Sequence, residues 1–518
     1  MLLLATVVEL SAARGAQANL ACSQGVLQGI APKHVTITSA TETTLPAPFT
    51  ASYCAVIGSI ETLNPGPNQV GFEVDLPDTW NGRLAFEGNG GFAGTLQAVG
   101  TAEYDETLEL GYVAAATDTG HISLFPPDLA DLDGSFLLNN LAKQADFAYR
   151  SVHVSTQTAK SLITGYYSAA VTRSYYLGCS TGGRQGLVEA QLYPADFDGL
   201  LVGDPAISDP IAGFNWNDQA LLATADSWLS PTNIALLDSS VLAECDAKDG
   251  VTDGLIQDPR KCNFDPTTIE CSNDNVTGCL DADQVTALQK IWAGAKTKNG
   301  LQLYPGYAQS DPGGVDGWDE WITGETQPAL GVSEPWGASV IPLQFTFQDQ
   351  YMKFGVFSNP NYDSLDFSFS NGSDVSKLMA SVSKWGASGV NPNLWPLVNH
   401  GRKLLMYHGF SDPALTPFVS INYYNSVNAA LGNNMNRTRN TARLFMVPGM
   451  HHCSGGPGPN EFDALTPLVQ WVENGSAPDN IIALNPDTGR TMPLCAYPET
   501  AHYDGTDPVD VASSWTCK

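Results

Sequence analysis

Gly178-Cys179-Ser180-Thr181-Gly182 is the stretch that decides the predicted fold. This G-x-S-x-G pattern follows a short, largely aromatic run at 174–177 and precedes a helix-like stretch at 183–192. A serine on a sharp turn from strand to helix projects its hydroxyl away from the sheet edge, and the flanking glycines allow a backbone too tight for a Cβ. The pattern arises readily by chance in a chain with 49 glycines. The prediction of a strand-to-helix turn at Ser180 therefore rests on the strand before the pattern and the helix after it.

The segments around this turn alternate between strand and helix patterns. Strand patterns lie at 70–76, 83–87, 112–117 and 197–203. In the first of these, apolar residues alternate with polar ones, which predicts a strand with one exposed face. Apolar residues at helical spacing between 138 and 162 predict a long helix before the serine strand. Strands that alternate with helices indicate a mostly parallel sheet covered on both faces, and therefore an α/β fold.

A long insertion interrupts this alternation. Residues 206–401 are rich in Pro, Gly and Asn and hold eight of the eleven tryptophans. We interpret this stretch as a lid domain, and 19–205 together with 402–518 as the catalytic domain. Strand patterns resume at 403–408 and 442–447, followed by a helix pattern at 461–473.

Length and charge limit the function classes. At 518 residues the chain is too long for one compact core, which favours two domains or one domain with a large insertion. A formal net charge of -30 argues against nucleic acid and anionic membranes as partners. No apolar run after the N-terminus is long enough to span a bilayer. We therefore expect no nucleic-acid or membrane partner, and the chain as a monomer or a homodimer.

Several features predict secretion. Residues 1–18 begin with an apolar run and end in the small-x-small cleavage signal Ala16-Gln17-Ala18, as in a secretory signal peptide. Glu9 interrupts the run and no basic residue precedes it, so a frayed N-terminal helix is the alternative. The ten cysteines, an even number, suit an oxidising compartment. Acceptor sequons, which suit a glycoprotein, lie at Asn275, Asn371, Asn436 and Asn474.

Three candidate catalytic residues each follow a predicted strand. Asp412 lies beyond the strand at 403–408, and His452 lies beyond the strand at 442–447. With Ser180 they give the order serine, acid, histidine, which is that of α/β-hydrolases, whose sites lie at the carboxyl ends of strands. A neutral imidazole would accept the serine proton and later protonate the leaving alcohol. The aspartate would hold the imidazole tautomer and stabilise the imidazolium.

The loop Gly88-Asn89-Gly90-Gly91-Phe92 directly follows the strand at 83–87. Backbone N–H groups approach a substrate closely only where no side chain intervenes, so a glycine-rich loop here is a candidate oxyanion donor. We predict that the backbone N–H groups of Thr181 and of Gly90 or Gly91 hold the oxyanion.

Other residues compete for the catalytic roles. They are Asp204 as the rival acid, His451 as the rival base, and His121 and His408, which we expect to be structural. Cys179 precedes the serine and Cys453 follows His452, so a disulfide between them would tie the nucleophile to the base. Such a bond would select His452 over His451.

These motifs closely resemble those of the tannase and feruloyl esterase family, whose signature couples Cys-Ser, Asp and His-Cys through such a disulfide. The matching residues are 178–186, Asp412 and 448–453, and the resemblance extends from about Cys22 to Cys517. It implies an α/β-hydrolase core with a large inserted lid domain. It also implies disulfides between Cys22 and Cys54, Cys245 and Cys262, Cys271 and Cys279, and Cys495 and Cys517.

An acidic loop at 245–256 fits two interpretations. Carboxylates crowded between glycines repel one another unless a cation neutralises them, and calcium tolerates irregular oxygen ligation. A solvated acidic turn is the alternative, and the loop is not an EF-hand, because Lys248 and Gly250 stand where oxygen side chains would be needed. The loop is similar to the family's lid calcium loop. This implies a structural Ca²⁺ held by side chains of Asp246, Asp249 and Asp253 and by carbonyls of Val251 and Leu255.

The resemblance implies a secreted serine carboxylic ester hydrolase that works through an acyl-enzyme. The expected substrate is a small ester of an aromatic, hydroxycinnamic acid, carried on plant cell-wall polysaccharide or on quinate, as for type B feruloyl esterases. The length of the chain favours this over a processed two-chain fungal tannase. A tannase acting on gallate esters and depsides, a terephthalate monoester hydrolase and a serine peptidase of the same fold remain as alternatives.

Overall fold

The computed structural model describes residues 19–272, 277–337, 341–384, 388–505 and 507–518. The predicted signal peptide, residues 1–18, and the sequon at Asn275 lie outside the described residues. The other three sequon asparagines are exposed. Within the described part of the chain, no helix combines the length and the apolar character needed to cross a membrane.

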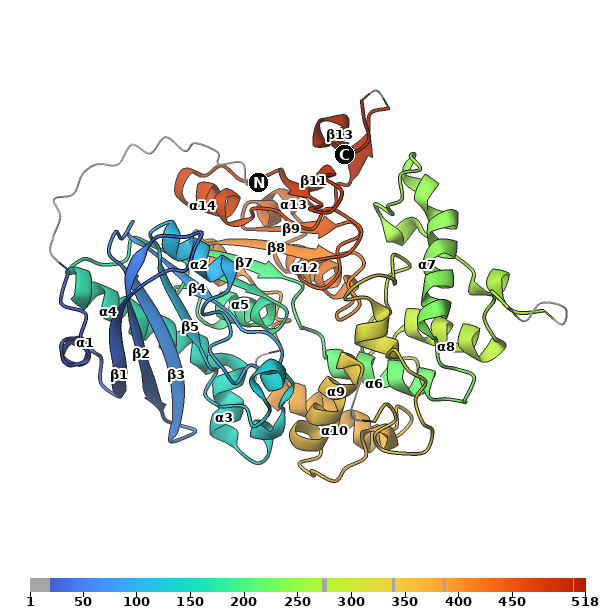
Figure 1. Cartoon of the computed structure of the whole chain (residues 1–518), viewed down its shortest axis with the longest axis horizontal. Helices are drawn as coiled ribbons and strands as arrows, with labels where there is room; N and C mark the ends of the chain where they lie inside the picture. The colour runs from blue at the N-terminus through green and yellow to red at the C-terminus, as the bar shows by residue number, and fades with distance from the viewer. Residues whose placement is uncertain (1–18, 273–276, 338–340, 385–387, 506) are drawn as a thin grey trace.

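A nine-stranded sheet forms the centre of the fold, in the order β1-β2-β3-β5-β4-β6-β7-β8-β9 (Figure 1). Its strands are β1 (Val35–Thr44), β2 (Ser52–Thr62), β3 (Asn68–Pro77), β4 (Arg83–Glu87), β5 (Val113–Thr117), β6 (Arg173–Cys179), β7 (Gly199–Gly203), β8 (Lys403–Gly409) and β9 (Ala442–Val447). The first three pair antiparallel, whereas every neighbouring pair from β5 to β9 is parallel. The predicted α/β fold is therefore confirmed.

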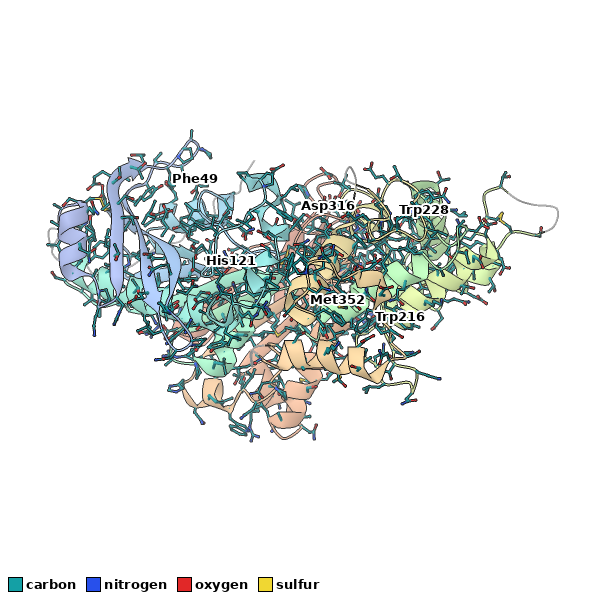
Figure 2. All side chains as sticks on the ribbon, turned by 90° about the horizontal axis from the view of Figure 1, so that it is seen from below. Phe49, His121, Trp216, Trp228, Asp316 and Met352 are labelled. Carbon is teal, nitrogen blue, oxygen red and sulfur yellow. A yellow bond between two sulfur atoms is a disulfide. The ribbon has the colours of Figure 1, made fainter. Side chains whose placement is uncertain are left out.

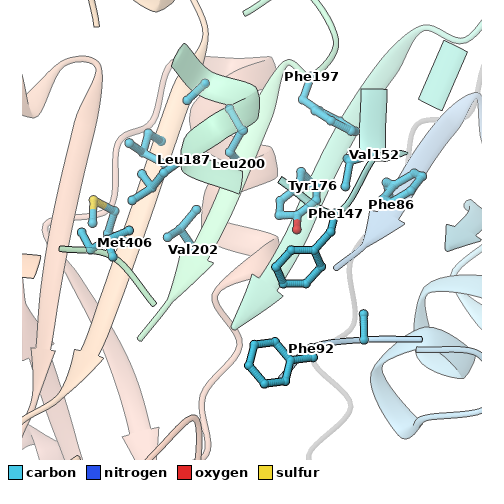
Figure 3. Packing of buried hydrophobic residues seen from close by; sticks show 14 of the residues in the cluster. Phe86, Phe92, Phe147, Val152, Tyr176, Leu187, Phe197, Leu200, Val202 and Met406 are labelled. Carbon is cyan, nitrogen blue, oxygen red and sulfur yellow. The ribbon is translucent and has the colours of Figure 1, made fainter. Parts of the chain in front are cut away.

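Helices cover both faces of this sheet. The helices of the described chain, with α6 to α11 in the predicted lid stretch, are α1 (Gln24–Ile30), α2 (Ala102–Glu109), α3 (Leu141–Ala145), α4 (Ser151–Tyr167), α5 (Thr181–Leu192), α6 (Pro210–Leu221), α7 (Pro231–Cys245), α8 (Ala282–Ala293), α9 (Leu343–Gln350), α10 (Gly372–Lys384), α11 (Trp395–Asn399), α12 (Phe418–Ala430), α13 (Met435–Arg439) and α14 (Leu465–Asn474). On one face, Tyr176, Val202 and Met406 of adjacent strands pack with Val152 of α4 and Leu187 of α5 (Figure 3). Apolar residues of α2 and α14 cover the opposite face.

The helix predicted at 138–162 is present as a nearly continuous run from α3 to α4. A π-helical turn at Asp146–Arg150 joins the two. Asp146 is fully buried there and accepts hydrogen bonds from Thr62 and Asn68. The turn thus places one carboxylate where it ties the helix to the sheet.

The strand at 70–76 differs from the prediction of one exposed face. In β3, Glu73 is only 8% exposed and Asp75 is completely buried. The reason is that α2 lies over this second face, where the hydroxyl of its Tyr104 donates to Asp75 over 3.0 Å. Because these partners are distant in sequence, the alternation alone could not reveal the burial.

The predicted lid stretch, 206–401, carries α6 to α11 and packs in two ways. Residues between 220 and 322, including Trp318, form a hydrophobic cluster of their own. Other lid residues, among them Phe214, Tyr351 and Leu397, belong to the cluster that also covers the main sheet. Figure 2 shows Trp216 and Trp228 in this part of the molecule, at the end away from β1.

Five disulfides join the ten cysteines in the pairs that the sequence and the resemblance indicated. They are Cys22–Cys54, Cys179–Cys453, Cys245–Cys262, Cys271–Cys279 and Cys495–Cys517. The last of these closes a tail of two small hairpins, β10 (Asn480–Leu484) with β11 (Thr491–Cys495) and β12 (Ala501–Tyr503) with β13 (Trp515–Cys517). Disulfides are typical of proteins that fold in an oxidising compartment.

Candidate active site

Ser180 lies on a sharp turn between β6 and α5. Its backbone has φ 61° and ψ -124°, a conformation that is costly for a residue with a Cβ and typical of a nucleophile held at a strand-to-helix turn. The turn is fixed from both sides, because the Ser180 N–H donates to the carbonyl of Gly203 and its carbonyl accepts from Ala206. A Cβ at Gly178 would lie 2.7 Å from the carbonyl carbon of Gly182, so this turn requires glycine.

His452 and Asp412 form a hydrogen-bonded pair. The Nδ1 of His452 lies 2.8 Å from Oδ2 of Asp412, and the carboxylate is fully buried. Burial alone would lower the pKa of His452, but the charge and the hydrogen bond of Asp412 outweigh it and hold the pKa above its usual value. For Asp412, burial alone would raise the pKa. The charges and hydrogen bonds of His452 and His408 outweigh burial and hold the pKa of Asp412 well below its usual range. The pair is therefore arranged as an ionised acid that orients a base.

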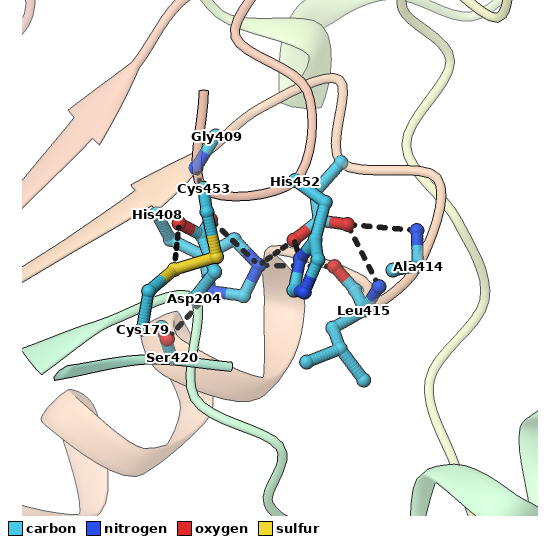
Figure 4. The surroundings of a disulfide bond; sticks show 10 residues. Cys179, Asp204, His408, Gly409, Ala414, Leu415, Ser420, His452 and Cys453 are labelled. Carbon is cyan, nitrogen blue, oxygen red and sulfur yellow. Dashed lines mark hydrogen bonds and ion pairs between the residues drawn. A yellow bond between two sulfur atoms is a disulfide. The ribbon is translucent and has the colours of Figure 1, made fainter. Parts of the chain in front are cut away.

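A second pair, His408 and Asp204, lies against the first (Figure 4). The Nε2 of His408 lies 3.3 Å from Oδ2 of Asp412 and 3.6 Å from Oδ1 of Asp204, and all of these side chains are buried. The Asp204 carboxylate also accepts from the N–H of Gly409 and lies 3.3 Å from the sulfur of Cys179. Burial raises the pKa of Asp204 to about 7. Asp204, the predicted rival acid, thus lies beside His408, whereas Asp412 is the hydrogen-bond partner of His452.

The disulfide between Cys179 and Cys453 connects the two halves of the site. Their Cα atoms are 6.0 Å apart, although 274 residues separate them in the sequence. Cys179 is the neighbour of Ser180 and Cys453 is the neighbour of His452, so the bond fixes the turn of the serine against the loop of the histidine.

The other histidines have different surroundings. His451 is fully buried, and its Nδ1 lies 3.0 Å from the carbonyl oxygen of Val315 in the lid stretch. His121 stacks on Phe136, and burial lowers its pKa to about 4. Neither residue lines the cavity at Ser180. The geometry thus favours His452 as the base.

Thr181, Gly90 and Gly91, whose backbone N–H groups are the predicted oxyanion donors, all line the cavity at Ser180. Thr181 is the first residue of α5, so its N–H has no acceptor within the helix. Gly90 and Gly91 both line the cavity, but the N–H of Gly90 donates to Oε1 of Gln97 over 3.0 Å. The N–H of Gly91 has no partner among the described residues. Of the two predicted glycines, the geometry therefore favours Gly91.

A cavity of about 1330 Å³ opens at Ser180 and His452. One part of its wall is aromatic, formed by Phe92, Phe147, Phe214, Trp321, Phe347 and Tyr351. The Trp321 ring lies edge-on to the His452 ring, with their centroids 5.1 Å apart. The rings of Phe347 and Phe92 also lie edge to face, with their centroids 5.3 Å apart. Of the lid tryptophans that the structure describes, Trp321 alone lines this cavity. A flat aromatic acyl group would find ring contacts here.

The acidic loop of the lid contains the residue types of a calcium site. The pKa of Asp249 is raised to about 6 by burial and by the charges of Asp253 and Asp246, so the three carboxylates lie close enough to repel one another. Asp246 accepts the N–H groups of Asp253 and Gly254, and Asp253 pairs with Arg490. Each carboxylate keeps further lone pairs, and oxygen donors of this kind suit Ca²⁺. These residue types therefore suit the ion that the resemblance implies.

Sequence reasoning missed several residues of the site. It did not foresee that Gln97 occupies the N–H of Gly90, or that Arg184 and Tyr351 line the cavity. The acidic loop is distant from the triad in sequence, yet its Leu255 lies against Gly449, three residues before His452. No local pattern signals such contacts, since each joins segments far apart in the chain.

Comparisons with known proteins place this geometry in context. A family model described as tannase and feruloyl esterase matches residues 54–518. The mono(2-hydroxyethyl) terephthalate hydrolase of Piscinibacter sakaiensis is 31% identical, over 91% of this chain and 86% of its own length. A probable feruloyl esterase B-2 of Aspergillus flavus is 29% identical, over 85% of this chain and 82% of its own. The crystal structure of feruloyl esterase B from Aspergillus oryzae superposes with a TM-score of 0.83 at 25% identity, covering 96% of this chain and 100% of that one.

Proposed function

Since the chain belongs to the tannase and feruloyl esterase family of carboxylic ester hydrolases, we propose that it cleaves esters of hydroxycinnamic acids, as a feruloyl esterase does. The aromatic wall of the cavity supports an aromatic acyl group. The alcohol part of the ester would be a group on plant cell-wall polysaccharide or a small polyol acid such as quinate.

The residues of the site divide the reaction between them. Ser180 Oγ attacks the ester carbonyl while His452 Nε2 takes its proton, and Asp412 stabilises the imidazolium that forms. The N–H groups of Thr181 and Gly91 hold the oxyanion of the tetrahedral intermediate. The imidazolium then gives its proton to the leaving alcohol, and the acyl group remains on Ser180. A water molecule, deprotonated by His452, attacks this acyl-enzyme and releases the acid.

The observation that carries this proposal is the alignment of His452 with Asp412 beside the disulfide from Cys179 to Cys453. A 2.8 Å hydrogen bond to Asp412 sets the tautomer of His452. The disulfide joins Cys453, the neighbour of His452, to Cys179, the neighbour of Ser180. A structural role alone gives no reason for a strained serine, a histidine and a buried ionised acid to meet at one cavity.

The test is the initial rate on methyl ferulate, methyl gallate and mono(2-hydroxyethyl) terephthalate. We expect the highest kcat/KM on methyl ferulate. Ser180→Ala should lower kcat by a factor on the order of 10⁵ to 10⁶ without changing the melting temperature by more than a degree or two, because it removes the nucleophile and leaves the fold. Substantial residual turnover by a folded Ser180→Ala enzyme would rule out the acyl-enzyme mechanism.

The same rates decide between related activities. Preference for the gallate ester would make the chain a tannase in activity. Preference for the terephthalate monoester would instead match the activity in the name of the 31% identical relative. For that substrate the free carboxylate needs a cation, and Arg184 at the cavity wall is the residue to test, as Arg184→Gln.

We also propose a structural Ca²⁺ in the acidic loop, held by the side chains of Asp246, Asp249 and Asp253 and by the carbonyls of Val251 and Leu255. When bound, the ion would neutralise the mutual repulsion of the carboxylates. The loop packs on the C-terminal hairpins, where Leu255 and Met492 share a cluster, so the ion would join the lid to the tail.

Chelation should therefore destabilise the protein. We expect EDTA to lower the melting temperature by roughly 5 °C, because a ligand bound only to the folded state stabilises it. Asp249→Asn should lose most of this response, whereas Glu270→Gln, an exposed carboxylate elsewhere in the lid, should keep it. An unchanged melting temperature together with no metal by elemental analysis would refute the site.

Secretion is part of the same proposal. Five disulfides and exposed sequons at Asn371, Asn436 and Asn474 support an extracellular glycoprotein. Expression with the native first 18 residues, followed by N-terminal sequencing of the protein in the medium, tests it. Release beginning near Asn19 is the expected result.

A further inference from the structure

The wall of the cavity away from the aromatic residues carries a group of carboxylates. They are Glu87, Glu103, Glu106, Glu461 and Asp463, and they are called here the acidic arm. They come from the end of β4, from α2 and from the segment before α14. In Figure 1, α2 and α14 lie near each other and away from the lid helices α6 and α9.

The acidic arm begins next to the reacting groups. Glu87 directly precedes the glycine-rich loop of the oxyanion site, and it is in register with Leu177 of the serine strand. Leu177 also lines the cavity and lies three residues before Ser180. If the aromatic wall holds the acyl ring, then the acidic arm is the part of the cavity left for the alcohol.

The charge of the arm is strongly negative. Burial raises the pKa of Glu106, and so do the charges of Asp463 and Glu103, which shows that these carboxylates lie close together. Among the described residues that line the cavity, Arg184 is the one Arg or Lys, and its guanidinium lies over Phe147 in the aromatic wall. An alcohol that carries a carboxylate would meet this field without a compensating cation.

Glu87 indicates what the arm accepts. It is only 5% exposed, and its Oε1 has no hydrogen-bond partner in the described structure although it lies at the cavity wall. Burial raises its pKa well above the usual value, which favours the protonated form. A protonated carboxyl can both donate to and accept from a hydroxyl. Phe462 and Tyr407 also line the cavity, and their ring centroids are 5.2 Å apart.

We propose that the acidic arm is the alcohol subsite and that it selects a neutral, polyhydroxylated alcohol, such as a sugar residue, over an alcohol that carries a carboxylate. The outer carboxylates of the arm, Glu103, Glu106, Glu461 and Asp463, are exposed. The arm is thus open to solvent and accepts a sugar that remains part of a longer chain. This inference rests on the proposed function, because it takes the aromatic wall as the acyl site.

The experiment compares esters that share one acyl group. The full-length enzyme is given feruloyl arabinose, feruloyl quinate and feruloyl choline, with methyl ferulate as the reference. At low ionic strength we expect kcat/KM on the sugar ester to exceed that on the quinate ester by at least about tenfold. Added salt should raise the rate on the quinate ester and narrow this ratio, because the outer carboxylates are exposed and screened.

Variants of the arm test the assignment of residues. The double variant Glu103→Gln with Glu106→Gln should raise the ratio of quinate ester to methyl ferulate by roughly three- to tenfold. The matched control is Glu42→Gln with Glu270→Gln, which removes two exposed carboxylates that do not line the cavity. This control should leave every ratio unchanged.

Three results would overturn the inference. They are a quinate ester cleaved as well as the sugar ester, a choline ester preferred tenfold over the sugar ester, and a ratio that the control variant moves as much as the arm variant. Failure of the proposed function is a separate result, namely no cleavage of methyl ferulate. In that case the same series of alcohols on the acyl group that the enzyme does accept tests the arm.

Discussion

Asp412 is the residue on which the proposed chemistry depends most. Its Oδ2 lies near both His452 and His408, while its Oδ1 accepts the N–H groups of Ala414 and Leu415 at 2.8 Å each. Donors around a buried carboxylate favour its charged form, which is why the pKa of Asp412 is lowered despite its burial. Over the whole range in which His452 titrates, Asp412 therefore keeps its charge and the histidine keeps its orientation.

Asp204 allows a test of this arrangement by pH. Its charge adds to that of Asp412 in raising the pKa of His452, whereas His408 opposes it. The base must be neutral to act, so a raised pKa places the acid limb of kcat/KM above the ordinary imidazole value near 6.5. Asp204 is partly ionised near its own pKa of about 7. In Asp204→Asn this charge is lost, so the pKa of His452 falls and we expect the acid limb to move to lower pH.

The measurement is kcat/KM on a neutral ester from pH 5 to 8. The charged and titratable groups that face Asp204 are His408, Asp412 and His452, and Tyr407 lies beside them. Glu42→Gln, which removes an exposed charge from β1, should leave the limb in place. A limb that stays fixed or moves upward in a folded Asp204→Asn enzyme would contradict the electrostatic role of Asp204.

At the scale of elements, the disulfide between Cys179 and Cys453 joins the end of β6 to the loop after β9. Closing a loop of 274 residues constrains the unfolded chain, with a stabilisation of up to about 5 kcal/mol in the chain-entropy account. Its second effect is local, since it fixes His452 against Ser180. We expect the double variant Cys179→Ala with Cys453→Ala to lose both stability and more than about a hundredfold in kcat/KM.

The matched control is the double variant Cys22→Ala with Cys54→Ala. That bond joins the start of the described chain to β2, on the part of the sheet distant from β6 and β9 in the strand order. It should cost stability but little activity per folded molecule. Melting temperatures and kcat/KM of both variants, measured where each is folded, separate the effects. Equal losses of activity would contradict a positioning role for the bond beside Ser180.

The elements near Ser180 could be predicted because each has a local signal. The parallel strands are apolar runs, and their ends carry Ser180, Asp412 and His452 in a recognisable order. The burial of Asp75 and the contact of Asp204 with His408 could not be predicted, because their partners come from other elements. Short tail hairpins lack a distinctive period as well.

Taken as a whole, the molecule contains many buried acids. Burial raises the pKa of Asp75, Glu87, Glu189, Asp204, Asp209, Asp218 and Asp311. For Asp204, Asp209 and Asp311 the folded value is about 7. In the unfolded chain these groups titrate near 4, so between about pH 4 and 7 the folded state binds more protons than the unfolded one. Stability must then fall as pH rises through this window.

Repulsion among the negative charges of the chain also destabilises the folded state as pH rises. The net charge is -30 at pH 7, and it shrinks at lower pH because carboxylates are protonated. Acids with lowered pKa, such as Asp412 and Glu473, oppose this trend only below about pH 4. We therefore expect the melting temperature to be highest near pH 5 and to fall by about 5 °C or more on going to pH 8, at fixed ionic strength and with excess calcium. Asp311→Asn should flatten this slope, since it removes one acid whose proton uptake accompanies folding. A melting temperature that rises steadily toward pH 8 would show that the buried acids are not protonated in the folded enzyme.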